Sequence, residues 1–362
     1  LSEVELTEHG YVLATLPANT EEALPVIGLI AHMDTSSDAS GANVKVQLHQ
    51  GYEGKDIILS EGNMLSPKDF PELLNYVGQD IITSDGTTLL GADDKAGICA
   101  IVSACEYLLA HNEVKHGKVR ICFTPDEEVG RGTEHFPLES FGADFAYTID
   151  GGAYNEINYE NFNAASAIVK VNGLDIHPGS AKGQMINAVS IACEFEMMLD
   201  EFAKPMYTEG YEGFNHLCEM SGCVTTATMD YILRNHDLTK LEQQKQDFIN
   251  IAEKLNQKYG ANTVELQIKD SYKNMAEYIK KDPRSVIAAT KAMQRLGINT
   301  VTSPIRGGTD GAKLTLMGLN TPNLGTGGYN CHGPYEFACL EEMEKVVEIL
   351  IEIRYDYTFI PN

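Results

Sequence analysis

Five short stretches of the sequence place histidine or carboxylate side chains directly after runs of apolar residues. They are His32 with Asp34, Asp93 with Asp94, Glu127 with Glu128, Asp150, and His332. Imidazole nitrogen and carboxylate oxygen are ligands of zinc-type divalent cations, and two such cations that share a carboxylate can activate a water molecule for hydrolysis. No single stretch supports this chemistry, but the five together predict a hydrolase with two metal ions.

Each of the five stretches also has an ordinary structural explanation. A histidine close to an aspartate after a strand is most often held by that carboxylate without a metal, and paired aspartates commonly cap the helix that follows them. Adjacent glutamates are usually solvated, an Asp-Gly-Gly sequence is a common turn, and His332 could be a loop residue without a task. We favour a metal site because all five stretches end strand-like segments that we expect to share one edge of a sheet.

The segments that would position these residues alternate between strand and helix. Continuous apolar runs at residues 25–31, 118–124 and 145–149 are typical of strands buried on both faces. Over residues 95–109 the apolar positions repeat at helical spacing, so the paired aspartates before them stand at the start of a helix. The sequence therefore predicts an α/β fold, in which a mixed sheet is flanked by helices and the carboxyl ends of its strands gather at one rim.

The rest of the chain on either side of its middle region is expected to complete this sheet and the helices that cover it. Residues 36–86 are polar and rich in glycine, which predicts hairpins and a long surface excursion. Beyond the middle of the chain we expect a helix at residues 283–296, an apolar segment near 314–319, and a last helix at 340–355 that covers the sheet.

The middle of the chain has a different organisation. Strand, helix, strand, helix and strand are predicted in turn at residues 164–171, 187–202, 224–233, 238–259 and 263–269. The longest helix is well delimited, with Asp237 as its N-cap and Gly260 just beyond its end. Because this region lacks a cluster of histidines and carboxylates, we expect a small two-layer α/β module inserted into a catalytic domain. The predicted boundaries are residues 1–162 and 273–362 for the two catalytic parts and 163–272 for the insertion.

Composition excludes several classes of protein. The chain has 362 residues, more than one compact core usually holds, and 27 Lys and Arg against 52 Asp and Glu give a formal net charge of −25. This charge repels phosphate backbones and anionic lipids, so we expect neither nucleic acid nor a membrane as a partner.

The cysteines and the start of the chain indicate where the protein works. Eight scattered cysteines, often within apolar runs, indicate free thiols in a reducing compartment. No apolar run approaches the roughly 18 residues of a membrane span, and no secretory leader opens the chain, so we expect a cytoplasmic protein. The sequence opens at Leu1, within a strand-like stretch, and we expect that an N-terminal piece is missing.

The residue types also suggest how the chemical work is divided. Two metals need about three protein ligands each and a position for water, which two histidines and three carboxylates supply if one carboxylate bridges. A further acid must stay unligated to take a proton from the attacking water and return it to the leaving amine. Either Glu127 or Glu128 suits that role.

Seven stretches of the chain resemble the M20 family of metallopeptidases. They span residues 31–35, 91–97, 124–132, 149–152, 177–183, 305–311 and 326–333. The likeness covers essentially the whole chain. Within the family, the stretches around His177 and Arg306, together with residues 208–214, are similar to the branch that removes the N-terminal residue from tripeptides.

The resemblance implies a zinc-exopeptidase-like fold and a role for each residue of the five stretches. The two ligand sets that it implies share Asp93: His32, Asp93 and Asp150 for one metal, and Asp93, Glu128 and His332 for the other. Glu127 would be the general base and acid, and Asp34 would orient and polarise His32. The metals would be two zinc ions, for which cobalt or manganese are possible substitutes.

The resemblance also assigns roles in the inserted module, which would be a lid and dimerisation domain. His177 would reach the partner subunit's site and stabilise the tetrahedral oxyanion. Arg234 and Arg306 would bind substrate, since a guanidinium group suits a peptide carboxylate. The alternative for both arginines is a surface ion pair.

The sequence thus predicts a cytoplasmic, homodimeric, dizinc aminopeptidase that removes the N-terminal residue from tripeptides. A first alternative is an M20-type deacylase or a carboxypeptidase-like amidohydrolase. A second is a metal-dependent peptide-binding protein without catalytic activity.

Overall fold

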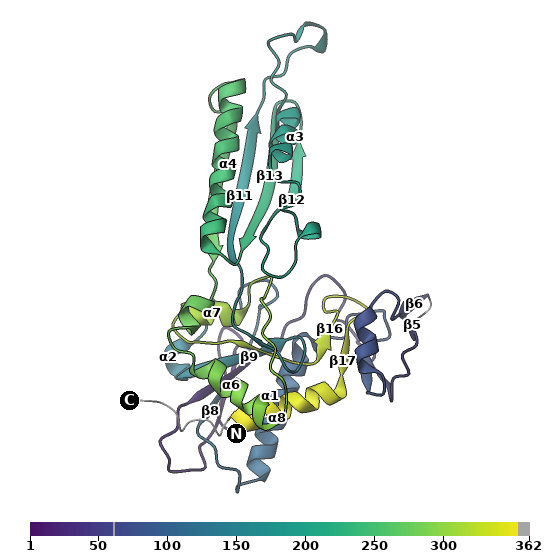
Figure 1. Cartoon of the computed structure of the whole chain (residues 1–362), viewed down its shortest axis with the longest axis vertical. Helices are drawn as coiled ribbons and strands as arrows, with labels where there is room; N and C mark the ends of the chain where they lie inside the picture. Colours follow the sequence, from purple (N-terminus) through teal and green to yellow (C-terminus); the bar gives the residue numbers. More distant parts are fainter. Residues whose placement is uncertain (61, 354–362) are drawn as a thin grey trace. The chain divides into compact units, whose positions relative to one another are not determined.

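The computed structural model describes residues 1–60 and 62–353 of the chain (Figure 1). The chain divides into two compact units. Unit 1 consists of Leu1–Tyr159, Met275–Ser303 and Thr309–Asn362, and unit 2 of Glu160–Asn274 and Pro304–Gly308. Unit 2 is therefore an insertion that also takes in a short later segment.

Unit 1 is built on a seven-stranded mixed sheet. In spatial order its strands are β1 (Ser2–Leu6), β2 (Val12–Leu16), β8 (Val119–Thr124), β3 (Ile27–His32), β9 (Phe145–Gly151), β15 (Asn323–Gly325) and β10 (Ile157–Asn158). The central strands β8, β3 and β9 and their neighbour β15 run parallel, whereas β2 pairs antiparallel with β8 and β10 with β15. The α/β class and the three buried strands predicted from apolar runs are confirmed.

Helices cover both faces of this sheet (Figure 1). The helices of unit 1 are α1 (Ala92–Ala110), α2 (Leu138–Phe141), α5 (Ala276–Ile279), α6 (Arg284–Arg295), α7 (Asp310–Leu316) and α8 (Leu340–Ile353). The predicted helix at 283–296 corresponds to α6, and the predicted last helix corresponds to α8, with residues 354 and 355 outside the described part of the chain.

Alternating side chains of the central strands face two apolar cores. Leu29 and Ile121 pack into a core with α1, α6 and α8, whereas Ile30 and Cys122 pack into a core with α2 and α7. Each large apolar side chain buried in this way contributes about 1.5–3 kcal/mol to folding. Burial on both faces is the reason that these strands read as continuous apolar runs.

A close approach of α1 to β9 brings two parts of the predicted site together. A Cβ atom added at Gly97 would collide with the backbone carbonyl of Ile149, so only glycine allows the helix to lie this near the strand. Asp93 and Asp150, which lie close to these two residues in sequence, are brought to the same edge of the sheet.

Two smaller sheets of unit 1 contain the strands of the polar, glycine-rich excursion, and one of them also takes in two strands from residues 328–339. Their strands are β16 (Gly328–Tyr329), β17 (Phe337–Cys339), β7 (Ile81–Thr83) and β4 (Gln47–His49) in one sheet, and β5 (Ile57–Ser60) and β6 (Asn63–Leu65) in the other. A short 3-10 helix at Pro71–Tyr76 packs with them. β5 and β6 form a hairpin of the kind predicted there, whereas β4 and β7 pair antiparallel although β5 and β6 lie between them in the sequence.

Unit 2 is a two-layer module in which helices pack on one antiparallel sheet (Figure 1). Its strand order is β12 (Phe214–Gly222), β13 (Thr226–Asn235), β11 (Asn163–Asn172) and β14 (Val264–Tyr272), and its helices are α3 (Ala188–Met198) and α4 (Leu238–Tyr259). Single 3-10 turns occur at Pro178–Ser180 and Pro205–Tyr207. Phe195, Tyr231 and Phe248 lie at the centre of its core.

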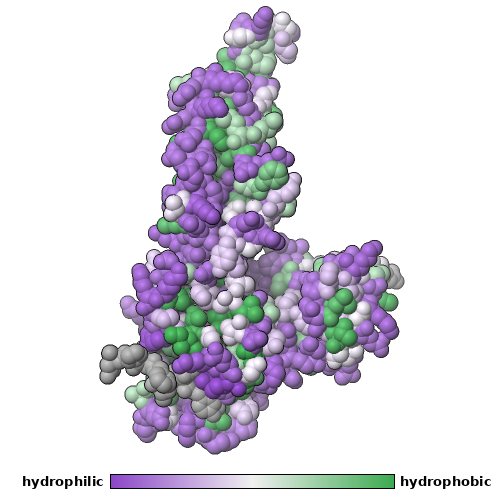
Figure 2. Space-filling view, viewed as in Figure 1, coloured by the Kyte–Doolittle hydropathy of each residue, from purple (hydrophilic) through white to green (hydrophobic). Residues whose placement is uncertain are grey.

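The helix limits of unit 2 follow from local chemistry. The side chain of Asp237 accepts hydrogen bonds from the backbone amides of Thr239 and Lys240, and Gly260 ends α4 with a positive φ of 117°. Figure 2 shows that α4 presents hydrophilic residues to solvent. None of the helices in the described part of the chain combines the length and apolar character of a membrane-crossing helix.

Two predictions for unit 2 were wrong in detail. The sequence predicts three strands, but Phe214–Gly222 forms a fourth at the edge of the sheet. Most of its side chains are exposed or half-buried, so it lacks an apolar run. Helix α3 also ends at Met198 instead of residue 202.

Candidate metal centre

The structure brings the five predicted stretches to one rim of unit 1. His32 is the last residue of β3, Asp150 lies near the end of β9, and Glu127 and Glu128 follow shortly after the end of β8. Asp93 lies at the start of α1, and His332 lies in the loop between β16 and β17. The parallel direction of the three strands is what places their carboxyl ends together.

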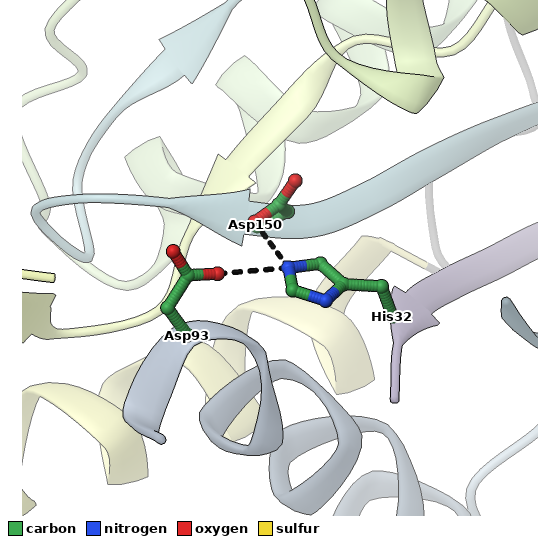
Figure 3. A group of neighbouring side chains, drawn as sticks. All are labelled: His32, Asp93 and Asp150. Carbon is green, nitrogen blue, oxygen red and sulfur yellow. Dashed lines mark hydrogen bonds and ion pairs between the residues drawn. The ribbon is translucent and has the colours of Figure 1, made fainter. Parts of the chain in front are cut away.

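The first group of ligand atoms surrounds the imidazole of His32, whose side chain is only 3 % exposed. His32 Nε2 lies 2.8 Å from Asp93 Oδ1 and 3.6 Å from Asp150 Oδ1 (Figure 3). Figure 3 shows the two carboxylates, one from a helix start and one from a strand end, pointing at the same ring nitrogen.

The second group uses the other oxygen of Asp93. His332 Nε2 lies 3.3 Å from Asp93 Oδ2 and 3.0 Å from Glu128 Oε2. Within each group all ligand atoms lie within 4.8 Å of one another. Asp93 therefore presents one oxygen to each group, which is the arrangement of a bridging carboxylate.

The donor atoms of both groups fit divalent cations. Around a tetrahedral zinc ion with bonds of about 2.0–2.1 Å, neighbouring ligand atoms lie about 3.3 Å apart. The separations of 2.8–3.6 Å found here bracket that value. Glu128 Oε1 is buried without a hydrogen-bond partner, so this oxygen is available to bind a cation.

The negative charges of the carboxylates in the site also favour the binding of cations. Among the described residues, no lysine or arginine forms an ion pair with Asp93, Glu128 or Asp150. Burial, followed by repulsion from Asp93, raises the pKa of Glu128, and burial raises that of Asp150. Burial alone would lower the pKa of His32, but hydrogen bonds with the surrounding aspartates, Asp150 foremost, raise it overall. The residues thus attract positive charge to the place where a metal would bind.

Asp34 connects His32, a candidate metal ligand, to the glutamate pair. Its Oδ1 accepts a hydrogen bond from the backbone amide of Glu127 (3.1 Å), and its Oδ2 accepts one from the backbone amide of Glu128 (3.0 Å). Its backbone carbonyl lies 3.1 Å from His32 Nδ1. When Nδ1 donates its proton there, the lone pair of Nε2 is free to face a metal.

Replacing Asp34 with asparagine tests this connection. Asparagine offers one acceptor and one donor, so either the Glu127 or the Glu128 amide would meet an NH₂ group. We expect kcat for the hydrolysis predicted from the sequence to fall about 10- to 100-fold, the usual effect of losing a residue that supports metal ligands. Steady-state kinetics and metal analysis check this. Asp126→Asn, an exposed change in the same loop, should leave kcat near the wild-type value. An unaltered kcat in Asp34→Asn would contradict the prediction.

Glu127 belongs to neither group, but it is close enough to interact with the charges of Asp150, His32 and Glu128. Its carboxylate forms no hydrogen bond or ion pair with the residues that the structure describes, although its backbone amide is held by Asp34. Burial, followed by the charge of Asp150, raises the pKa of Glu127 to about 8. A carboxylate with a pKa near neutrality can both take and return a proton.

Comparisons with known proteins identify the family of the chain. The model of Peptidase family M20/M25/M40 matches residues 86–355. The chain belongs to this family. Peptidase T of Caldanaerobacter subterraneus subsp. tengcongensis is 54 % identical over 355 residues, which cover 98 % of this chain and 87 % of that protein. Peptidase T of Listeria innocua is 52 % identical with the same coverage.

Solved structures show the fold of the M20 peptidases in this chain. The aminopeptidase PepT from Bacillus cereus superposes with a TM-score of 0.76 at 22 % identity, covering 95 % of this chain and 84 % of that one. A tripeptidase from Staphylococcus aureus gives a TM-score of 0.77 at 21 % identity, covering 97 % and 87 %. A dinuclear metal-binding M20 peptidase from Bacillus subtilis gives 0.60 at 16 % identity, covering 97 % and 87 %.

The three residues predicted to bind substrate or oxyanion lie in unit 2 of this M20 family member. His177 precedes the 3-10 turn at Pro178–Ser180, and its Nδ1 accepts a hydrogen bond from the amide of Gly179 (3.1 Å). Its imidazole is exposed, so Nε2 can donate to another molecule.

The two arginines contact backbone carbonyls. Arg306 Nη1 donates to Gly210 and Glu212 at 2.8 and 2.9 Å, and Nη2 donates to Thr208. Arg234 Nη1 donates to the carbonyls of Ala165 (3.1 Å) and Leu233 (2.9 Å), and its guanidinium lies over the ring of Tyr272. Neither arginine forms the alternative ion pair with a described residue.

Two buried acids close to the site have contacts that the sequence does not predict. Asp94 Oδ2 accepts a hydrogen bond from the amide of His32 (3.0 Å), which ties the end of β3 to the start of α1. Asp310 Oδ2 accepts one from Thr124 Oγ1 (3.1 Å) at the end of β8, and burial raises the pKa of Asp310 to about 6. Asp94 stands next to Asp93 in one of the five stretches, whereas the signal that could have singled out Asp310 is its place in the family-like stretch at 305–311.

Proposed function

We propose that this chain is a dizinc aminopeptidase that removes the N-terminal residue from tripeptides. The observation that carries the proposal is the pair of ligand groups sharing Asp93, with the unpaired carboxylate of Glu127 beside them. Membership of the M20 family and more than 50 % identity to peptidase T proteins along nearly the whole chain support the choice of substrate.

The residues that would hold the metals are the two groups already described. His32, Asp93 and Asp150 would bind one zinc ion, and Asp93, Glu128 and His332 the other, with cobalt or manganese as possible substitutes. When bound, the two cations supply Lewis acidity for the scissile carbonyl and for the attacking water.

Glu127 would move the proton in the reaction. Its carboxylate takes a proton from water as the oxygen bonds to the first peptide carbonyl carbon. It then gives that proton to the amide nitrogen as the C–N bond breaks, so that the shortened peptide leaves with a neutral amine. Asp34 holds the backbone of Glu127 and the ring of His32 in place during both steps.

Unit 2 would act as a lid and dimerisation domain. We assign the exposed His177 to the partner subunit's site, where Nε2–H would stabilise the oxyanion, since Nδ1 already accepts from Gly179. Arg234 and Arg306 remain candidates for binding the C-terminal carboxylate of the substrate. The Nη atoms of Arg306 also hold the 208–212 segment, so this arginine would shape the segment as well.

We also place the enzyme in the cytoplasm. All eight cysteines are free thiols, as expected in a reducing compartment.

Metal content measured together with hydrolysis of di-, tri- and tetrapeptides tests the function. We expect two metal equivalents per chain, fastest hydrolysis of the tripeptide, and little hydrolysis of the same tripeptide after N-acetylation. Preference for the acetylated peptide would favour a deacylase or carboxypeptidase-like amidohydrolase instead. Metal binding without any hydrolysis would favour a peptide-binding protein.

A further inference from the structure

Glu336 is a buried carboxylate that binds the backbone of the segment leading into Asp93. Its Oε2 accepts hydrogen bonds from the amides of Leu90 and Gly91, both at 2.7 Å, and its Oε1 accepts one from the amide of Asp93 at 3.0 Å. The residue is only 1 % exposed and lies just before β17. Both oxygens are thus fixed by a segment far away in the sequence.

These three amides compensate for the burial of a charged group. An ionised carboxylate removed from water is very costly unless it is paired or hydrogen-bonded. In the described part of the chain, Glu336 forms no ion pair with a lysine, arginine or histidine. Hydrogen bonds from amides to a carboxylate are shorter and stronger than those between neutral groups, so the contact holds the segment tightly.

The start of α1 needs such support from outside the helix. Gly91 is the N-cap residue and has no side chain with which to bond the first amides. Its backbone is left-handed, with φ of 78° and ψ of 28°, and the backbone of Asp93 is not helical, with φ of −83° and ψ of 102°. The hydrogen-bond ladder of α1 therefore does not determine how the Asp93 side chain is directed.

Glu336 also belongs to the loop that carries His332. Its own backbone amide donates to the carbonyl of Gly333 (3.2 Å), the residue after His332. His332 itself has a positive φ of 71°, which is uncommon for a residue with a side chain. One residue thus links the segment of Asp93 to the segment of His332.

We propose that Glu336 is a positioning residue for the dinuclear centre. It fixes the backbone from which Asp93 reaches both ligand groups, and it closes the turn beside His332. The inference rests on the proposed function, because it takes Asp93 as the shared ligand. Its consequence is that Glu336, which would touch neither metal, sets the affinity for both.

Glu336→Gln tests this role. Glutamine keeps the shape of the side chain but turns one acceptor into a donor that faces an amide. We expect the affinity for both zinc ions to fall about 10- to 100-fold. Competition with a chromogenic chelator measures this, and a changed visible absorption spectrum of the cobalt-loaded protein would report altered ligand geometry. A merely structural role would lower the melting temperature without metal and leave affinity and spectrum unchanged.

Glu341→Gln is the matched control. Glu341 also accepts backbone hydrogen bonds, from the amide of Asp80 at 3.1 and 3.0 Å, but it contacts neither residues 90–93 nor a ligand group. The Glu341→Gln variant should bind metal with the affinity of the wild type. If Glu336→Gln does not fold, Glu336→Asp replaces it. The shorter side chain keeps the charge but cannot reach all three amides, so weaker metal binding is again expected.

The outcomes separate this inference from the proposed function. A wild type that binds two metals and hydrolyses tripeptides, beside a Glu336 variant with wild-type affinity and spectrum, would overturn the role of Glu336 alone. A wild type that binds no metal would overturn both. Weaker binding in the Glu336 variant and unchanged binding in Glu341→Gln would support the role.

Discussion

Replacing Glu127 with glutamine is expected to lower kcat for tripeptide hydrolysis by about 10²- to 10⁴-fold, the usual contribution of a general base. Glutamine has the size of glutamate but cannot take a proton from water. Because Glu127 belongs to neither ligand group, both metal equivalents should remain bound. Steady-state kinetics with a free tripeptide and metal analysis of the same preparation measure the two quantities.

Glu134→Gln serves as the control for that experiment. Glu134 is an exposed residue of the neighbouring segment, and its ion pair with Arg131 lies at the surface, where such pairs contribute little. Its kcat should match the wild type. Hydrolysis by Glu127→Gln at the wild-type rate would exclude Glu127 as the base. Loss of metal from the same variant would show instead that Glu127 acts as a ligand.

Replacing Asp93 with alanine is expected to abolish binding of both metals, whereas replacing His332 should remove only one. Asp93 is the single residue common to both groups, and it presents Oδ1 to His32 and Oδ2 to His332. Metal equivalents retained after dialysis distinguish the two variants. Activity should be lost in Asp93→Ala, since neither the carbonyl nor the water would be activated.

Thermal stability gives a second readout for Asp93. A ligand present at 100 times its dissociation constant stabilises the folded state by about 2.7 kcal/mol for each site. The wild type should therefore melt at a higher temperature with zinc than with a chelator, and Asp93→Ala should show no such difference. Retention of one tightly bound metal by Asp93→Ala would mean that the two groups do not depend on a shared ligand.

The sequence predicts the site residues that directly follow buried strands. The apolar runs before His32 and Asp150 and before the glutamate pair identify buried parallel strands, and parallel strands end at one rim. The shared rim is enough to predict that these ligand residues lie close together. Their division into two groups and the place of Asp34 came from resemblance to a family, and their roles remain predictions.

The contacts that hold the ligands in place left no comparable pattern. Glu336 accepts hydrogen bonds from the amides of Leu90 and Gly91, which lie far earlier in the sequence. Every residue except proline has a backbone amide, so the sequence does not indicate which amides such a carboxylate will bind. The bonds from the Glu127 and Glu128 amides to Asp34 are of the same kind. The edge strand Phe214–Gly222 was not predicted for another reason. Most of its side chains are exposed or half-buried and need not be apolar, so the sequence there has no apolar run.

The two ligand groups also bear on when the centre can form during synthesis. One histidine is residue 32 and the other is residue 332, and Glu336 joins the neighbourhoods of both. Such long-range contacts form late, because the intervening chain must first be ordered. A ribosome-bound chain that has not passed residue 336 lacks the support of Asp93, and one that stops before residue 332 also lacks a histidine. We therefore expect peptide hydrolysis to begin only after translation has passed residue 336.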